Sequence, residues 1–141
     1  MTIFFKTCLK RDVLYAKWQG RISVNEFIDV FHAYTQGDHY MPGRSELIDT
    51  SEMIDFDVSF HEMRGLLRNV NSQSTYQSVK TKTVIFCPND YIFGLSHMYQ
   101  KLAELDNGIK VELYEKEHEA LAALNLPYST IYDFLVKETL L

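Results

Sequence analysis

The chain has 141 residues, the size of one ordinary domain and enough to bury a substantial hydrophobic core. Its composition, with 46% hydrophobic and 23% charged residues, is typical of a folded globular protein and argues against intrinsic disorder. Lysine and arginine number 14 against 19 acidic residues, and this net charge of −5, without a basic cluster, argues against nucleic-acid binding.

Hydropathy and cysteine content indicate where the protein works. No apolar run approaches the length of a bilayer crossing, and the first residues lack the apolar stretch of a secretory signal. Cys8 and Cys87 lie in apolar, strand-like runs, and one pair of cysteines does not make a disulfide framework. We therefore expect no transmembrane segment and a cytoplasmic location.

The chain begins with a predicted antiparallel hairpin. Residues 3–9 and 13–18 have the apolar character of strands, and the connection at residues 10–12 is short enough for a tight turn. Gly20 is expected to end the second strand, because glycine weakens a strand interior.

Two helices and a short strand are expected next. Residues 23–26 have the pattern of a capping box, which predicts a first helix that ends near Gly37. Residues 46–49 predict a short third strand. A second capping box at residues 59–62 predicts the start of the second helix.

Strands and helices also alternate in the second half of the chain. Residues 83–87 are apolar on both faces, as in an interior strand, whereas residues 109–114 alternate as an edge strand does. The expected helices run from about Asp90 to a stop at Asn107 and Gly108, from Glu117 to about Leu124, and from Tyr128 to Thr139.

This order of elements predicts an α/β fold. Strands that alternate with helices pair in parallel through right-handed crossovers. The expected architecture is a mixed, mostly parallel five-stranded sheet with an opening antiparallel hairpin and about four to five helices. We expect residues 1–141 to form a single domain.

Four short segments carry a resemblance to a known family. They are Trp18–Gly20 at the end of the second strand, Leu47–Ser51 with a carboxylate in the third strand, Asp90–Tyr99 at a helix start, and Val111–Leu121. With the element order, they make the chain similar to the STAS domains of anti-sigma-factor antagonists. The resemblance is closer to the bacterial SpoIIAA-like proteins of the same fold group, and it covers nearly the whole chain.

The resemblance implies a small non-enzymatic module that binds a protein or a lipid-like partner. In some relatives a serine at the start of the second helix is phosphorylated as a switch, and the corresponding residue here is Ser59. Classical antagonists carry Asp-Ser-Ser-Gly at that turn, whereas here Phe60 follows the serine and the glycine is absent. The alternative is that Ser59 is only a helix N-cap, for which serine is strongly preferred.

The junction between the fourth strand and the next helix is the predicted ligand or partner site. Ligands of open α/β sheets bind where strands end and helices begin. The candidate interaction surface there consists of Asp90, Tyr91, Phe93, Gly94 and His97. Phe93 lies off the apolar stripe of this helix, which predicts an exposed side chain, although packing against the sheet is the alternative for aromatic residues.

Catalysis and cofactor chemistry find little support in the sequence. We expect no cofactor and no metal, because no phosphate-binding loop or metal-ligand spacing occurs. One alternative is acid–base catalysis by His97 with Asp90 or Asp49. A second is a reactive Cys87, because a helix N-terminus lowers a thiol pKa, against the ordinary role of a buried hydrophobic residue.

Two classes of function remain. One is a regulatory or protein-interaction module, which predicts a dimer or an exposed apolar patch and no deep pocket. The other is a carrier or sensor of a small apolar or lipid-like ligand, with possible membrane association, which predicts a cavity between the first three helices and the sheet.

Self-association is expected from the first hairpin. Phe4, Phe5, Tyr15 and Trp18 are more apolar than one packed face needs, and a symmetric dimer would bury the surplus. This hypothesis predicts that Trp18→Lys shifts the protein to a monomer.

Overall fold

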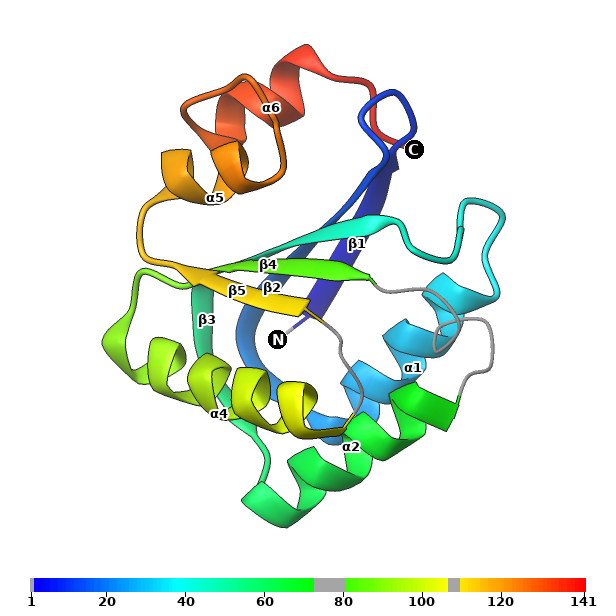
Figure 1. Ribbon diagram of the computed structural model, residues 1–141, viewed down its shortest axis with the longest axis vertical. Helices are drawn as coiled ribbons and strands as arrows, with labels where there is room; N and C mark the ends of the chain where they lie inside the picture. Colours follow the sequence, from blue (N-terminus) through cyan, green and yellow to red (C-terminus); the bar gives the residue numbers. More distant parts are fainter. Residues whose placement is uncertain (1, 73–80, 107–109) are drawn as a thin grey trace.

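The computed structural model describes residues 2–72, 81–106 and 110–141 (Figure 1). Along the chain the elements are β1 (Thr2–Cys8), β2 (Val13–Ser23), α1 (Val24–Thr35), β3 (Ser45–Asp57), α2 (Phe60–Ser72), β4 (Lys82–Phe86), α4 (Asp90–Asp106), β5 (Lys110–Tyr114), α5 (Glu117–Ala123) and α6 (Ile131–Lys137). The helix stop predicted at residues 107–108 lies outside the described residues.

All five strands of the described chain form one sheet in the order β1-β2-β3-β4-β5. The β1–β2 pair is antiparallel and the other pairs are parallel, so the predicted mixed α/β sheet with an opening hairpin is confirmed. Each of α1, α2 and α4 connects neighbouring parallel strands. Right-handed crossovers in one direction place these three helices on the same face, and α5 and α6 lie on the other (Figure 1).

The second and third strands are longer than predicted. Gly20 does not end β2, because at φ 71° it takes up an irregularity in the pairing with β3, and the strand continues to Ser23. The predicted strand at residues 46–49 extends to Asp57. Its second half is rich in polar residues, so its β-structure depends on pairing with β2 rather than on propensity.

The C-terminus is fastened to the β1–β2 turn. Thr7 and Leu141 exchange two backbone hydrogen bonds of 2.9 Å each. The Nε atom of Arg11 donates to a carboxylate oxygen of the buried Glu138 at 2.7 Å, and the Tyr128 hydroxyl donates to the same oxygen. These contacts hold α6 against the sheet.

The sheet separates two hydrophobic cores, because successive side chains of a strand point to opposite faces. The core beneath α1, α2 and α4 includes buried residues such as Ile22, Met63, Leu67 and Ile92. The core beneath α5 and α6 includes Val13, Leu47, Val84, Leu121 and Phe134.

Some large apolar residues at helix ends are exposed. Phe60 at the start of α2 is 55% exposed, and Leu105 in the last turn of α4 is 80% exposed. Phe60 is the first residue of α2, and Leu105 is the last but one of α4. None of the helices in the described part of the chain is long and apolar enough to cross a membrane.

Candidate functional site

A cavity of about 130 Å³ lies between the sheet and the three crossover helices. Side chains from β1 to β4 form its floor, and side chains from α1, α2 and α4 form its walls. Protein interiors contain few voids larger than a water molecule, so a cavity of this size in a small domain is an unusual feature.

Aromatic rings line the end of the cavity near the carboxyl ends of the parallel strands. Trp18 from β2 packs against Phe27 of α1, with ring centroids 5.6 Å apart, and against Phe56 of β3 at 5.5 Å. Phe31 stacks on Phe27 at 6.2 Å. This end of the cavity is therefore almost entirely apolar.

The helix α1 is the least buried wall. Tyr34 is its one buried residue among those described, whereas Phe27, Val30 and Phe31 are half-buried although all three line the cavity. An amphipathic helix normally buries its apolar stripe fully. Incomplete packing of α1 on the sheet thus accounts for much of the space beneath it.

Polar side chains gather at the opposite end of the cavity. Glu46 of β3 is 8% exposed, and its side-chain oxygen Oε1 accepts a hydrogen bond of 2.8 Å from the Thr83 hydroxyl. The two residues are paired in register on neighbouring strands, which places both side chains on the same face. Ser96 and Tyr99 of α4 and Tyr34 of α1 also contribute hydroxyl groups to the lining.

Burial keeps the two cavity tyrosines in their neutral, hydrogen-bond-donating form. It raises the pKa of Tyr34 and of Tyr99 above the ordinary tyrosine value, and the negative charge of Glu46 raises both further. Arg44, a buried cation that pairs with Asp12 at 3.0 Å, lowers the pKa of Tyr34 but does not line the cavity.

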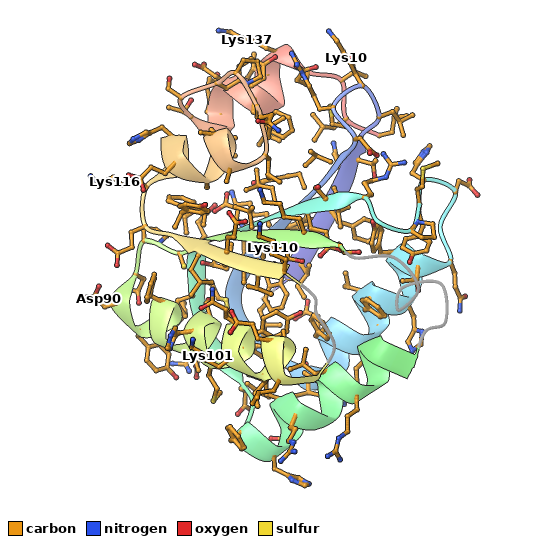
Figure 2. The ribbon with its side chains drawn as sticks, viewed as in Figure 1. Lys10, Asp90, Lys101, Lys110, Lys116 and Lys137 are labelled. Atoms are coloured by element: carbon orange, nitrogen blue, oxygen red, sulfur yellow. The ribbon has the colours of Figure 1, made fainter. Side chains whose placement is uncertain are left out.

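The predicted interaction surface lies at the start of α4, apart from this cavity. Asn89 begins the helix, because its side-chain oxygen accepts hydrogen bonds from the amides of Tyr91 at 2.9 Å and Ile92 at 3.2 Å. Asp90, Gly94 and His97 are exposed on the helix. Figure 2 shows Asp90 at the outer end of α4, away from the interior.

The two aromatic residues of this surface differ in burial. Of the two interpretations of Phe93, exposure and packing against the sheet, packing is supported, because the side chain is half-buried and packs against the core beneath α4. A wide apolar stripe on α4, which faces both the sheet and α2, accounts for its burial. Tyr91 is the exposed ring, at 57%, and its hydroxyl donates to Asp55 of β3 at 2.6 Å.

Ser59 lies exposed at the start of α2 and makes both hydrogen bonds of a capping box. Its hydroxyl accepts from the Glu62 amide at 3.1 Å, and the Glu62 carboxylate accepts from the Ser59 amide at 3.0 Å. The hydrogen bond from the Ser59 amide is the largest of the effects that lower the pKa of the Glu62 carboxyl. A phosphate on Ser59 would meet the favourable helix dipole and the nearby negative charge of Glu62.

The alternative catalytic groups are not brought together. Asp49 is buried, and its carboxylate accepts a hydrogen bond of 2.9 Å from the Tyr15 hydroxyl. It also accepts hydrogen bonds from the amide and the hydroxyl of Ser51. The alternation of β3 directs it to the face of α5 and α6, opposite α4 and His97. His97 lies seven residues after Asp90 on the same helix, a rise of about 10 Å.

Cys87 does not have the properties of a reactive thiol. It is fully buried, and burial raises its pKa to about 11. The alternative of an activated cysteine was therefore wrong, because desolvation outweighs the hydrogen bonds that favour the thiolate. No group of three or more His, Cys, Asp or Glu residues in the described ranges could hold a metal ion.

The aromatic residues of the first hairpin are largely used within the chain. Tyr15 is buried beneath α6, Trp18 packs in the cavity wall, and the ring of Phe5 lies 5.8 Å from that of Tyr34. Three of the four side chains of the predicted apolar surplus thus make contacts within the chain. Phe4 remains, at 53% exposure. Trp18→Lys would consequently disturb the fold and does not test a dimer.

Glu46, Thr83 and Ser96 were missed by the sequence analysis. Glu46 and Thr83 occupy the starts of two predicted strands, where a polar residue is ordinary. Their positions in the sequence could have indicated the pair. Each residue comes directly before the apolar run of its strand, so two neighbouring parallel strands would place Glu46 beside Thr83.

A search of the solved structures finds a similar fold. One match is the crystal structure of an uncharacterized protein of the DUF3478 family with a SpoIIAA-like fold, from Shewanella loihica PV-4. The TM-score is 0.57 at 16% sequence identity, over 87% of this chain and 94% of that one. The fold of this chain is SpoIIAA-like. The family resemblance seen in the sequence is thus confirmed at the level of fold.

Comparisons of the sequence with protein families and with curated proteins find no relative. No protein-family model matches the chain, and no curated protein matches it either. At 16% identity the structural similarity concerns the fold alone. Any function has to be argued from the site.

Proposed function

We propose that this protein is a non-enzymatic binding module that carries or senses a small, mostly apolar ligand in the cavity between the sheet and α1, α2 and α4. The observation that supports this proposal is the cavity of about 130 Å³ with an apolar wall and a polar cluster at one end. Ligand sites in proteins are typically concave, apolar pockets with a few placed polar groups.

The energetics of the cavity support a ligand. Cavity volume costs roughly 24 cal/mol per Å³ in core-truncation series, so an enclosed void of 130 Å³ costs about 3 kcal/mol, and a partly open one costs less. That is a large share of the 5–15 kcal/mol, roughly, by which proteins are stable. A ligand that fills the space recovers the lost contacts, which is a source of binding free energy.

The volume limits the size of the ligand. An engineered apolar cavity of about 150 Å³ in another protein binds benzene or xenon. A cavity of 130 Å³ therefore suits a molecule, or the part of a molecule, about as large as one aromatic ring. A complete lipid exceeds this volume, and only the end of an acyl chain would enter.

Native mass spectrometry of the protein purified from its own host tests the proposal. We expect a retained small-molecule mass under gentle conditions that is lost on denaturation. The matched variant is Ala16→Leu, whose added side chain would project into the cavity from β2. A protein that neither retains a ligand nor responds to any small apolar compound would contradict a carrier or sensor function.

A regulatory or protein-interaction module is the second candidate, supported by the exposed start of α4. The Tyr91 ring is 57% exposed while its hydroxyl is held by Asp55, so the ring is presented to solvent in a fixed position. Aromatic rings held in this way are favourable anchors for a partner protein. Self-association is one form that such a contact would take.

Two glycines provide a matched test of that surface. A side chain added at Gly94 on α4 or at Gly65 on α2 would meet open space, so both positions tolerate arginine sterically. If α4 forms a homodimer contact, Gly94→Arg shifts sedimentation toward the monomer and Gly65→Arg leaves it unchanged. Equal effects of the two variants would argue against this surface.

Three further predictions remain for experiment. Phosphorylation of Ser59 is one, and intact-mass measurement of protein from its own host would detect it. The cytoplasmic location is another, and two buried free cysteines accord with a reducing compartment. The absence of nucleic-acid binding is the third, and the labelled lysines of Figure 2 come from separate elements rather than from one cluster.

A further inference from the structure

The last helix, α6, exposes part of its apolar surface. Ile131 and Phe134 are buried in the core beneath α5 and α6. Tyr132, Leu135 and Val136 are exposed, and the Tyr132 ring is 74% exposed. Residues three and four apart are neighbours on a helix, so these three side chains share one face. The apolar surface of α6 is therefore wider than the core uses, and Figure 1 shows this helix at the outside of the molecule.

Two opposite charges accompany this face. Asp133 and Lys137 are four residues apart, so they lie on the same side of α6. Leu135 lies midway between them in the sequence. Neither Asp133 nor Lys137 forms an ion pair with another residue in the described part of the chain. The face thus combines an exposed apolar surface with one negative and one positive charge.

This arrangement is complementary to itself. In a twofold symmetric contact, the same surface of two subunits meets, and two equivalent helices can pack antiparallel. If the twofold axis passes beside Leu135, the residue two positions before it lies level with the residue two positions after it in the second copy. Asp133 of each chain then lies opposite Lys137 of the other, and the exposed apolar side chains between them become buried.

From these observations we propose that the protein forms a symmetric homodimer in which the α6 helices of two copies pack antiparallel. The apolar face supplies the buried contact, and the two pairs of Asp133 and Lys137 at its rim determine the orientation. The inference goes beyond the proposed function, because α6 lies on the opposite side of the sheet from the cavity and from α4 (Figure 1).

Other partners fit this face less well. An anionic lipid surface would attract Lys137 but repel Asp133, and the net charge of the protein is −5. A basic or an acidic segment of another protein would likewise match only one of the two charges. A second copy of the chain matches both. Because a helix of seven residues buries a small area, we expect a weak dimer with a micromolar Kd.

Sedimentation velocity across a micromolar concentration series tests the dimer with the unmodified protein. We expect the sedimentation coefficient to rise from the monomer to the dimer value as the concentration increases. Val136→Lys places a charge in the apolar contact at a position that is exposed in the single chain. It should raise the Kd at least about tenfold, because that charge would be desolvated in the dimer.

Reversal of each charge tests the antiparallel arrangement. Lys137→Glu places a like charge opposite Asp133 of the second copy, and Asp133→Lys does so opposite Lys137. Symmetry repeats each repulsion, so each variant alone should raise the Kd at least about tenfold. An equimolar mixture of the two variants should dimerise again, because positions 133 and 137 then carry opposite charges across the contact.

Matched controls separate the interface from general effects of charge. Lys101→Glu on α4 changes the net charge by the same amount at an exposed position, and should leave the Kd unchanged. Circular dichroism of each variant checks the fold. If a reversed charge unfolds the short helix, Lys137→Gln and Asp133→Asn remove the ion pairs without repulsion, and each should raise the Kd about twofold to fivefold.

Each remaining result overturns the inference. A protein that stays monomeric at every concentration has no such dimer. A dimer that persists in Val136→Lys and in both charge variants uses another surface, and its dissociation by Gly94→Arg would assign it to α4. A mixture of the two charge variants that stays monomeric would exclude the antiparallel arrangement. None of these results bears on the cavity, which the bound mass tests separately.

Discussion

The two faces of the sheet differ in how completely their side chains fill the space above them. Beneath α5 and α6, Leu121 and Phe134 are fully buried, and Tyr15 packs edge-on against Phe134 at 6.5 Å. Beneath α1, α2 and α4, three longer helices leave a cavity of about 130 Å³. The two short helices α5 and α6 thus pack more closely on the sheet than the three longer helices α1, α2 and α4 do.

This difference separates stability from the candidate function. Close packing supplies dispersion contacts that a void forfeits, so the face of α5 and α6 is expected to contribute more stability per residue. The other face gives up packing and keeps a polar cluster inside the core, as binding sites commonly do at the expense of stability. Four experiments test the comparison.

Truncation of aromatic side chains should show the largest contrast. Phe134→Ala removes a fully buried ring from the packed face and should lower the free energy of unfolding by about 3–5 kcal/mol. Phe27→Ala removes a half-buried ring from the cavity wall, and should have a smaller effect because that ring has fewer contacts to lose. Urea denaturation measures both, and equal losses would contradict the difference in packing.

Replacement of an alanine by leucine should change the free energy of unfolding in opposite directions on the two faces of the sheet. Ala120 is fully buried beneath the sheet's other face, and Ala120→Leu should destabilise by about 1–3 kcal/mol through overpacking. Ala16→Leu should instead stabilise by about 1 kcal/mol, because the cavity accommodates the added atoms. Thermal unfolding distinguishes the signs. A destabilised Ala16→Leu would mean that the cavity does not accept a side chain from β2.

Acidification should weaken the packed face through Glu138. Hydrogen bonds from Tyr128 and Arg11 lower the pKa of the Glu138 carboxyl below the ordinary glutamate value. The depressed pKa adds stability above about pH 4.5, and this contribution is lost as the pH falls through the folded-state pKa. Glu138→Gln should be less stable than the unmodified protein at pH 7, and the difference should shrink in acid. Parallel pH profiles would show that the contact adds no stability.

Thiol labelling should show the smallest effect, which is a difference in the order in which the two cysteines react. Cys8 belongs to the packed core and Cys87 to the cavity core, and both are fully buried. With a pKa raised to about 11, the Cys87 thiol should not react at pH 8 until its core opens. As urea increases, Cys87 should be labelled before Cys8, because the less densely packed core opens at lower free energy. Labelling of Cys8 first would reverse the assignment, and each single-cysteine variant serves as the control.

Most of the fold was predictable from the sequence because its signals are local. The hairpin connection, the capping boxes and the alternation of strands with helices act within a few residues, and together they determined the α/β class and its mixed sheet. The extension of β3 to Asp57 was not predictable in this way. Its polar residues become a strand only because β2 continues past Gly20 and pairs with them.

The candidate cavity was decided by the tertiary structure. The sequence alone established an apolar interior and predicted the two strands that contain Glu46 and Thr83, without singling out either residue. The register of β3 with β4 then placed Glu46 beside Thr83, and the packing of α1 left space above them. The strand register and the separation of α1 from the sheet both depend on contacts between residues far apart in the chain. Local sequence patterns contain no information about these contacts.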